Sequence, residues 1–294
     1  MQYLEEELVL ISKYSKYVPP KSQLLKWVGN KQRFASEITR CFPSYFNKYY
    51  EPFLGSGSIL ATVNPLQGVG SDTFSPLVEI WNKLKTDPKE LINWYREWRD
   101  QIETESKGAI YEKVKTSYNL QPNGKDFLFL SRSCYGGIIR FRKDGHMSTP
   151  CGVHTPISVQ AFADRVKIWN RRIINTEFFC WDYKSAFVNA KSNDMIYCDP
   201  PYSHSQSILY GAQNFSLEEL LNQISNAKDK GIKVALSIDG NKKSGNKICD
   251  LPIPKNLFER EILVDCGKSM LRRFQIEGQT MTGEQVFDRL LLTY

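Results

Sequence analysis

The stretch Tyr49-Tyr50-Glu51-Pro52-Phe53-Leu54-Gly55-Ser56-Gly57-Ser58 points most directly to the fold of this chain. Residues 49–53 are largely apolar and lead into a glycine-rich turn, which is typical of a short buried strand. Glycines at the end of a strand let the backbone approach a ligand closely. In open α/β sheets, this carboxyl edge is where nucleotides bind. We therefore predict a cofactor-binding turn here, with an ordinary connecting turn as the alternative.

A second strand is predicted at Gly68–Asp72, and its last residue is an acid that is suited to accept hydrogen bonds from ribose hydroxyls. The alternative for Asp72 is a helix cap. Two common nucleotide motifs are incomplete: Leu60 replaces the last glycine of G-x-G-x-x-G, and Ile262 replaces the first glycine of a phosphate loop ending in Gly267-Lys268-Ser269. The sequence therefore disfavours a ligand that carries a diphosphate.

A helical insertion follows the second strand. From Pro76 to about Asn119, apolar residues recur at helical spacing, and Asp87-Pro88 marks the start of one of these helices because proline suits a first helical turn. A hairpin is predicted next, with strands at 138–142 and 146–147. Its turn is Lys143-Asp144-Gly145, in which Asp-Gly supplies the positive φ values of a tight turn. Another helix is predicted at Ser158–Arg172, with Ser158 as its cap.

The second half of this insertion is basic. Seven cations face two anions between Ile138 and Ile173; the cations are Arg140, Arg142, Lys143, Arg165, Lys167, Arg171 and Arg172, and the anions are Asp144 and Asp164. The whole chain carries a net charge of +7, so most of its excess positive charge lies here. This distribution allows a polyanionic partner. A solvated helix face with a charged loop is the alternative.

Strand patterns return after the insertion, at Glu177–Cys180, Asp194–Cys198, Lys233–Ile238, Arg260–Val264 and Phe287–Thr293. A helix at Ser216–Ala227, which begins with Ser-x-x-Glu, separates two of them. We predict an α/β fold: a mostly parallel, doubly wound sheet with a mainly helical insertion that carries a β-hairpin. Residues 1–25 form an N-terminal extension, 26–76 and 174–294 a discontinuous sheet domain, and 77–173 the inserted domain.

Composition excludes several classes of protein. The chain has 294 residues, of which 41% are hydrophobic and 24% charged, which is ordinary for a globular protein. Its longest apolar runs, such as Leu8–Ile11, are far shorter than the roughly 18 residues of a membrane span. Acids at 5–7 replace the basic start of a secretory signal, so we expect a cytoplasmic protein. Seven scattered cysteines without C-x-x-C predict neither a zinc site nor a disulfide framework.

The chemistry is predicted from Asp199-Pro200-Pro201-Tyr202, which directly follows a strand. Two prolines remove two N–H donors and leave carbonyls beside an aromatic ring. The amino group on a flat heterocycle is a poor nucleophile because its lone pair is delocalised into the ring. A carboxylate and a carbonyl that accept its two N–H bonds draw the nitrogen toward tetrahedral geometry, and a stacked ring holds the base. The motif thus predicts methyl transfer to nitrogen without a metal; a surface turn is the alternative.

These motifs, in this order, resemble the DNA adenine methyltransferases of the Dam type, which use S-adenosylmethionine (SAM) to methylate the N6 atom of adenine. Residues 26–31 are similar to the family's K-W-x-G-x-K, residues 52–57 to its F-x-G-x-G loop, and residues 199–202 to its catalytic D-P-P-Y. The resemblance implies a Rossmann-like SAM-binding catalytic domain at 26–76 and 174–294, and a target-recognition domain at 77–173. It extends through most of the chain from residue 26 onward.

The resemblance also implies residue roles. The catalytic residues would be Asp199, Pro200, Pro201 and Tyr202. The SAM-binding residues would be Trp27, Lys31, Pro52, Phe53, Gly55, Gly57, Asp72, Asp182, Tyr183 and Asp199, with Asp72 on the ribose and Asp182-Tyr183 beside the adenine. Relatives often read D-x-N where this chain has Asp72-Thr73-Phe74, so the asparagine is missing.

For DNA, residues 131–137 resemble the family's N-R-x-x-Y-N-G, whose aromatic enters the base stack. Tyr135 keeps this aromatic, whereas Gly136 replaces the asparagine that helps it. Lys26, Arg140 and Pro150 match residues that meet bases in members reading GATC, which suggests that site. Arg142 and Lys143 complete the predicted DNA-binding set. Arg140 is equally suited to a phosphate contact.

The predicted function is a site-specific N6-adenine DNA methyltransferase that acts on a flipped-out base in double-stranded DNA, either alone or with a cognate restriction endonuclease. N4-cytosine methylation needs the same activation of a nitrogen lone pair, although such enzymes more often carry serine in place of Asp199. A non-catalytic SAM- or DNA-binding regulator would share the same fold, and an RNA or protein methyltransferase would share the same chemistry.

Overall fold

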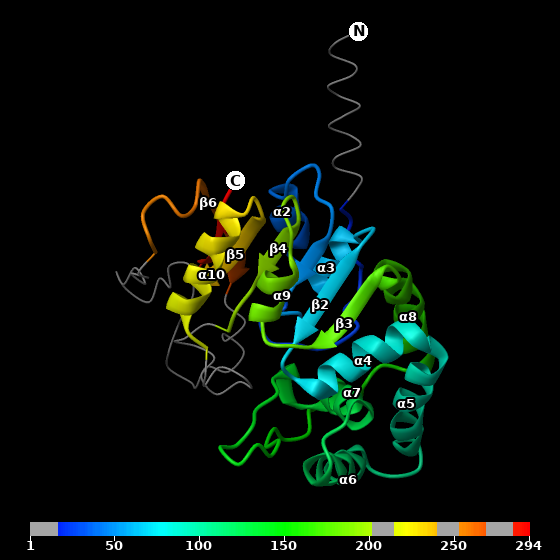
Figure 1. Ribbon diagram of the computed structural model, residues 1–294. Helices are drawn as coiled ribbons and strands as arrows, with labels where there is room; N and C mark the ends of the chain where they lie inside the picture. Colours follow the sequence, from blue (N-terminus) through cyan, green and yellow to red (C-terminus); the bar gives the residue numbers. More distant parts are fainter. Residues whose placement is uncertain (1–16, 202–214, 240–252, 269–284) are drawn as a thin grey trace.

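A single seven-stranded sheet organises the chain in the computed structural model, which describes residues 17–201, 215–239, 253–268 and 285–294 (Figure 1). The strand order is β3-β2-β1-β4-β5-β7-β6. The strands are β1 (Tyr49–Glu51), β2 (Gly68–Asp72), β3 (Thr176–Cys180), β4 (Met195–Cys198), β5 (Lys233–Asp239), β6 (Arg260–Lys268) and β7 (Gln285–Leu292). The first five are parallel, and β7 is antiparallel to both β5 and β6. The predicted mostly parallel α/β sheet is confirmed.

Helices cover both faces of the sheet. Outside the insertion they are α2 (Ala35–Arg40), α3 (Ser58–Val63), α9 (Lys184–Asn189) and α10 (Leu217–Asp229). The predicted cap of the last of these is present, since Ser216 Oγ accepts from the Glu219 N–H at 3.2 Å. The three helices α2, α3 and α9 were not predicted from the sequence. Each is only six residues long, too short for a clear helical period to emerge.

Two hydrophobic clusters, one for each face of the sheet, result from the alternation of side chains along the strands. Tyr49, Met195 and Tyr197 contribute to one cluster, and Tyr50, Ile196 and Cys198 to the other. A strand that is buried on both faces is apolar at every position, as β4 is. This burial explains why the sequence 195–198 gives such a strong strand signal.

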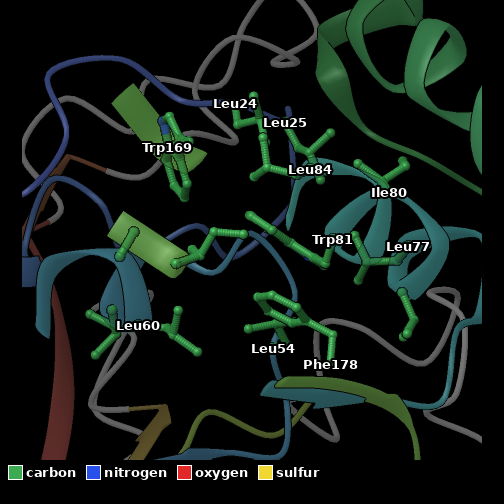
Figure 2. Packing of buried hydrophobic residues seen from close by; sticks show 14 of the residues in the cluster. Leu24, Leu25, Leu54, Leu60, Leu77, Ile80, Trp81, Leu84, Trp169 and Phe178 are labelled. Atoms are coloured by element: carbon green, nitrogen blue, oxygen red, sulfur yellow. The ribbon is translucent and has the colours of Figure 1, made fainter. Parts of the chain in front are cut away.

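The larger cluster joins the sheet to the insertion (Figure 2). Trp81, on the first inserted helix, stacks on Phe178 of β3, with ring centroids 5.8 Å apart and planes inclined by 19°. Trp169 lies against Trp81 at 5.7 Å. Leu54, from the turn after β1, belongs to the same cluster. The insertion is thus packed on the sheet through aromatic rings.

The insertion lies between β2 and β3, as predicted; α5, α6 and α7 lie beyond the carboxyl ends of these strands, and α8 runs beside β3 and leads to its amino end (Figure 1). Its helices are α4 (Ser75–Thr86), α5 (Pro88–Gln101), α6 (Lys107–Leu120), α7 (Gly124–Ser133) and α8 (Val159–Ile173), with a short 3-10 turn, η1, at Tyr135–Gly137. The predicted helix start at Asp87-Pro88 is present, and Asp87 accepts from the Glu90 N–H; the predicted cap of α8 is present too, since Ser158 accepts from the Ala161 N–H. The sequence did not predict α7, whose residues 127–131 are all buried and therefore show no polar face.

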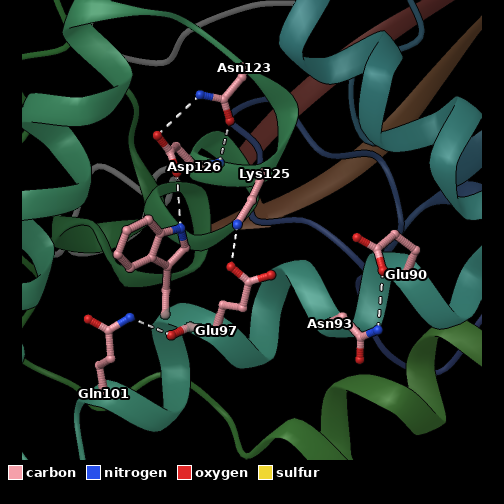
Figure 3. A network of polar contacts seen from close by, with 8 residues as sticks. Glu90, Asn93, Glu97, Gln101, Asn123, Lys125 and Asp126 are labelled. Carbon is pink, nitrogen blue, oxygen red and sulfur yellow. Dashed lines mark hydrogen bonds and ion pairs between the residues drawn. The ribbon is translucent and has the colours of Figure 1, made fainter.

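A polar network supports the start of α7 (Figure 3). Asp126 is buried and accepts a hydrogen bond from the Trp98 indole N–H at 3.0 Å, while Asn123 caps the helix through the Asp126 N–H at 2.9 Å. Lys125 pairs with Glu97 of α5. Because a buried carboxylate without partners is costly, this network is part of the packing between α5 and α7.

The expected N-terminal extension, residues 1–25, is described from Tyr17 onward, and its last residues belong to the core. Leu24 and Leu25 are fully buried. Arginines of the insertion bind the backbone of this segment: Arg132 donates to the Leu24 carbonyl, and Arg165 donates to the Gln23 carbonyl at 2.7 Å. The segment before Lys26 is thus held by α7 and α8, which sequence patterns did not reveal.

The predicted hairpin has a different turn from the one expected. A single bridge pairs Phe141 with Met147, and the Arg142 N–H donates to the His146 carbonyl at 2.9 Å. The Gly145 N–H donates to the Arg142 carbonyl, and Gly145 has a φ of 83°. This is a three-residue loop, in which only the glycine takes a positive φ and Asp144 does not. Asp144 instead accepts from the His146 N–H at 3.0 Å.

The other strand ends differ from prediction mainly at the far edge of the sheet, where β6 continues past Val264 to Lys268 across a bulge. The bulge interrupts the alternation of apolar and polar residues, which conceals the continuation. In the described parts of the chain, no helix is both long and apolar enough to cross a membrane.

We expect Gly124→Ala to destabilise the protein. A Cβ atom at Gly124 would lie 2.8 Å from Glu79 Cβ and 3.0 Å from the Pro76 carbonyl oxygen, so α7 and α4 would have to separate. Overpacking of this kind costs about 1–3 kcal/mol. Gly108, in the same insertion, has open space around it, and Gly108→Ala should leave stability unchanged or raise it by up to about 1 kcal/mol. Urea unfolding of both variants measures the difference, and equal effects would contradict this packing.

Candidate active site

A crevice opens where the order of the strands reverses. β1 pairs with β2 on one side and with β4 on the other, so the connections from these strands run in opposite directions. Open parallel sheets bind ligands at such a switch point, outside the carboxyl ends of the strands. A cavity of about 310 Å³ lies there. The predicted site residues that line it are Trp27, Lys31, Pro52, Phe53, Gly55, Asp72, Asp182, Tyr183, Asp199, Pro200 and Pro201.

The floor of the cavity is the turn after β1. Gly55 has a φ of 45°, and a Cβ atom there would lie 2.7 Å from the indole nitrogen of Trp27. Trp27 therefore covers the turn at a distance that only glycine permits. Gly57, with a φ of 59°, precedes α3 and lies against Trp81, and it is not among the lining residues. Its role is to let the turn enter the helix close to the insertion.

Asp72, at the end of β2, is tied to this turn. Its carboxylate accepts from the Gly55 N–H and from the Phe74 N–H, both at 3.1 Å. Burial raises the pKa of Asp72 to about 6, while the backbone N–H groups of Gly55, Phe74 and Thr73 act in the opposite direction. Asp72 lines the cavity, and its second bond holds the backbone of Phe74 just before α4; Phe74 is the N-cap residue of α4, which has no side-chain cap, so Asp72 is not a helix cap.

One wall of the cavity is aromatic. Phe53 and Tyr183 are stacked, with ring centroids 5.3 Å apart and planes inclined by 22°, and Phe215 meets Phe53 edge to face at 5.9 Å. Beside them, Asp182 accepts from the Lys184 N–H at 3.0 Å, at the beginning of α9. Flat rings next to a carboxylate form a slot suited to a purine.

Lys31 is the centre of a buried ion cluster. Its Nζ atom lies 3.0 Å from Asp199 Oδ1 and 3.2 Å from Asp288 Oδ2, and the side chain is 6% exposed. Burial lowers the pKa of Lys31, but the carboxylates of Asp199 and Asp288 outweigh this effect, and the pKa lies above its ordinary value. Lys31 is therefore a cation that holds the first residue of the D-P-P-Y motif.

Glu51, the last residue of β1, is a second buried acid in this cavity. The Tyr49 hydroxyl donates to Glu51 Oε2 at 2.7 Å. Burial raises the pKa of Glu51 to about 8; hydrogen bonds from Tyr49 and the Leu60 N–H oppose the rise, and Asp199 adds to it. At neutral pH this carboxyl is mostly protonated. The cavity therefore does not accumulate the full negative charge of its acids.

The predicted DNA-binding residues form an exposed group beside the cavity. The Tyr135 N–H donates to the Pro150 carbonyl at 2.9 Å, and a Cβ atom on Gly137 would lie 3.2 Å from Lys26 Cβ, so these four positions are close together. The Tyr135 side chain is 43% exposed. Arg140, Arg142 and Lys143, on the hairpin, are exposed as well.

Gly136, which stands where relatives often carry asparagine, has a φ of 64°. Asparagine is one of the few other residues that tolerate this left-handed conformation. The backbone requirement thus explains this departure from the family pattern. Tyr202, the remaining predicted catalytic residue, lies outside the described residues.

Several residues in or beside the cavity were not singled out from the sequence as site residues. Ile139, from the hairpin, and Phe215, before α10, line the cavity. Asp288, an acid within the apolar strand β7, does not line it but pairs with Lys31, which does. Glu51 was visible as a charged residue in a strand that is otherwise buried. An acid in an apolar strand is the signal that would have pointed to both Glu51 and Asp288. Among the described residues, no group of three or more histidine, cysteine or acidic side chains is arranged to hold a metal ion.

The strand order, the glycine turn after β1, the acid after β2 and the D-P-P sequence after β4 define a Rossmann-like α/β methyltransferase. The model of a family described as D12 class N6 adenine-specific DNA methyltransferase matches residues 27–266, and the chain belongs to this family. It is therefore an adenine-specific DNA methyltransferase. N6 of adenine is thus favoured over N4 of cytosine as the methylated atom, and membership of the family implies that SAM is the methyl donor.

Similar proteins come from bacteria, an archaeon and a phage. A DNA adenine methylase of Vibrio cholerae is 26% identical over 230 residues, which cover 72% of this chain and 79% of the relative. The Type II methyltransferase M.MjaIII of Methanocaldococcus jannaschii is 28% identical over 200 residues, covering 60% and 68%. The DNA N-6-adenine-methyltransferase of Escherichia phage P1 is 25% identical over 234 residues, covering 74% of this chain and 30% of the relative.

The raised pKa of Glu51 predicts a pH dependence of stability. The folded protein keeps this proton up to about pH 8, whereas an unfolded glutamate loses it near 4.5, so unfolding releases a proton between these values. The wild type should lose stability across this range by up to about 1.4 kcal/mol per pH unit. Glu51→Gln cannot titrate, so its free energy of unfolding should rise relative to that of the wild type between pH 5 and pH 8.

Urea unfolding at pH 5, 6.5 and 8 measures this difference. Glu218→Gln, the same change at an exposed position, shows how much of any trend comes from removing a carboxylate elsewhere. A stability difference between wild type and Glu51→Gln that does not vary with pH would show that the buried carboxyl is ionised throughout.

Proposed function

We propose that SAM and the target adenine meet in the cavity at the switch point, and that Asp199 and the Pro200 carbonyl activate the adenine amino group. The observation that carries this proposal is the placement of Asp199-Pro200-Pro201 in the wall of the cavity, with Asp199 held by buried Lys31. A carboxylate held by a buried ion pair is already oriented before the substrate arrives.

The cofactor side is supported by chemistry that matches the adenine, the ribose and the sulfonium of SAM. The stacked wall of Phe53 and Tyr183 suits the adenine ring, and Asp72 suits the ribose hydroxyls. The ion cluster of Lys31, Asp199 and Asp288 carries one net negative charge if both acids are ionised, which favours the cationic sulfonium of SAM. The Gly55 turn, beneath Trp27, lets the backbone approach the ligand.

In the transfer step, the lone pair of adenine N6 forms the new N–C bond while the C–S bond of the sulfonium breaks, with its electron pair left on sulfur. Asp199 and the Pro200 carbonyl accept the two N–H groups and so localise this lone pair. The proton that N6 loses passes to the nearest acceptor, Asp199, and then to solvent. The products are N6-methyladenine and S-adenosylhomocysteine.

Base flipping is required because an adenine inside a duplex cannot reach the methyl group. It costs roughly a few kcal/mol, and stacking of the flipped base on Tyr202 would return about 1–3 kcal/mol. Tyr135, exposed beside the cavity, is suited to fill the space that the base leaves in the helix. This role is supported by its position on the same exposed turn as Gly137, which lies against Lys26, and by its backbone bond to Pro150.

We assign target recognition to the insertion, residues 77–173, together with Lys26 from the catalytic domain. Arg140, Pro150 and Lys26 would meet bases, while Arg142 and Lys143 would bind phosphates. GATC remains the recognition sequence suggested by the resemblance. A cognate restriction endonuclease and a cytoplasmic location both stay predictions from the sequence.

We expect Asp199→Ala to abolish methyl transfer, because the amino group would lose the acceptor that localises its lone pair. Binding of S-adenosylhomocysteine should weaken only partly, since the Gly55 turn and Asp72 remain. The measurement uses methyl-labelled SAM with DNA from a host that lacks adenine methylation, followed by digestion to nucleosides and mapping of the label. Asp229→Ala, an exposed acid at the end of α10, is the matched control and should retain full activity. Turnover by Asp199→Ala near the wild-type rate would refute the mechanism.

We expect Arg140→Ala and Lys143→Ala to differ in their effect on sequence preference. If Arg140 reads a base, its loss should cost about 1–3 kcal/mol of binding and relax specificity at one position, whereas loss of Lys143 should weaken all duplexes alike and reduce the salt slope by about 1. Fluorescence anisotropy over a salt series, with duplexes altered one base pair at a time, separates the two. Lys230→Ala, before the amino end of β5, is the control and should change neither the sequence preference nor the salt dependence of DNA binding. Uniform weakening by Arg140→Ala would assign it to phosphate instead.

A further inference from the structure

The segment Ile138–Arg142 has two faces with different surroundings. Arg140 and Arg142 are exposed, whereas Ile139 is only 5% exposed and lines the cavity at the switch point. Phe141 is partly buried against the core. Because side chains alternate along an extended segment, the residues proposed to bind DNA and the residues that touch the cofactor cavity lie back to back on one piece of backbone.

Phe141 continues the inner face into a chain of aromatic contacts. It meets Phe74 edge to face, with ring centroids 5.6 Å apart and planes inclined by 62°. Phe74 in turn meets Phe127 of α7 at 4.9 Å and Trp27 at 6.4 Å. Since Trp27 covers Gly55, a path of packed rings connects the hairpin to the floor of the cavity.

Phe74 is also joined to the cavity through its backbone. Its N–H donates to Asp72, the same carboxylate that accepts from the Gly55 N–H. Phe74 occupies the position of the asparagine that relatives often carry in D-x-N. In this chain, therefore, the residue beside the proposed ribose-binding acid has an aromatic ring that packs on the DNA-facing hairpin.

Hydrogen bonds to neighbouring polar groups fix the position of the hairpin backbone. The Arg140 N–H donates to Thr149 Oγ1 at 2.8 Å, and the Tyr111 hydroxyl donates to the Thr149 carbonyl at 2.8 Å. The Asn119 side chain holds both the N–H and the carbonyl of Met147, at 2.8 and 3.1 Å. The inner residues cannot rotate outward without breaking these bonds, so a displacement of the inner face also moves the outer face.

We infer that Phe74, Ile139 and Phe141 are positioning residues that couple the two substrates: a ligand in the cavity orients Arg140 and Arg142 and thereby tightens DNA binding. This inference rests on the proposed function, because it takes the cavity as the SAM site and the hairpin as a DNA contact. Close-packed interiors transmit displacement rather than absorb it, and coupling between two sites is reciprocal. S-adenosylhomocysteine and DNA should therefore strengthen each other's binding by the same factor.

The test measures the dissociation constant of a duplex that contains the mapped target, with and without saturating S-adenosylhomocysteine, by fluorescence anisotropy at one fixed salt concentration. We expect the ligand to tighten DNA binding by wild type roughly fivefold or more, which is the lower range of allosteric couplings. The ratio of the dissociation constant without the ligand to the dissociation constant with it measures this coupling. Phe74→Asn and Phe141→Leu should bring this ratio close to one. Phe74→Tyr keeps the ring and should keep the ratio.

Lys143→Ala, in the turn of the same hairpin, is the matched control. It should weaken DNA binding equally with and without the ligand and leave the ratio intact, because Lys143 is not one of the residues that the inner contacts orient. Thermal melting checks that each variant is folded. Calorimetry without DNA checks that each variant still binds S-adenosylhomocysteine. A reciprocal calorimetric titration with and without DNA must return the same factor.

A wild-type ratio of one, or an unchanged ratio in Phe74→Asn and Phe141→Leu, would overturn the inference. The methyl-transfer assay keeps this outcome separate from the proposed function. If the wild type methylates adenine but its ratio of DNA dissociation constants is one, the inferred coupling is wrong and the proposed function stands. If wild type transfers no methyl group, the proposed function fails whatever the ratio.

Discussion

The ammonium of Lys31 joins three segments that are far apart in the sequence: the loop before α2, the end of β4 and strand β7. A buried cation between two carboxylates is stable only while both partners remain, and removing one member of such a cluster typically costs about 3–5 kcal/mol. The cluster therefore constrains where Asp199 can stand, and with it the two prolines that follow. This interaction thus fixes the residues that we propose to react.

The same constraint explains how the cavity and its immediate surroundings accommodate so many acids. Asp199 and Asp288 share the charge of Lys31, Glu51 keeps its proton to about pH 8, and Asp72 is bound by backbone N–H groups. Each acid is thus paired, protonated or hydrogen-bonded, as burial demands. What remains is a modest negative potential, which suits a sulfonium cation and would repel a ligand rich in phosphate. This agrees with the absence of a complete dinucleotide or phosphate-loop motif in the sequence.

The fold could be predicted from the sequence where a strand is buried on both faces of the sheet and its residues alone carry the signal. Strands β1, β2 and β4 gave clear signals, and the glycine turn and D-P-P-Y motif marked their carboxyl ends. The sequence could not reveal which distant residues would meet these ends. Asp288 pairs with Lys31 only because β7 is inserted antiparallel between β5 and β6, and Ile139 reaches the cavity only because the hairpin folds back over it. Helix α7 was missed for the opposite reason, since its central residues are buried on every side.

Two departures of this chain from the family pattern, at Gly136 and Phe74, each have a physical consequence in the structure. Gly136 satisfies a left-handed backbone position that asparagine also tolerates, so the turn survives although a side chain is lost. Phe74 replaces a polar group with a ring, and the ring gains contacts with Phe127 and Phe141 that a short amide could not make. The acid at the end of β2 and the hairpin over the cavity are thereby joined through apolar packing. Because these rings also contact Trp27, which covers the glycine turn, and because Ile139 lines the cavity, the insertion forms a second wall of the cavity, held by the same aromatic contacts that cover the turn.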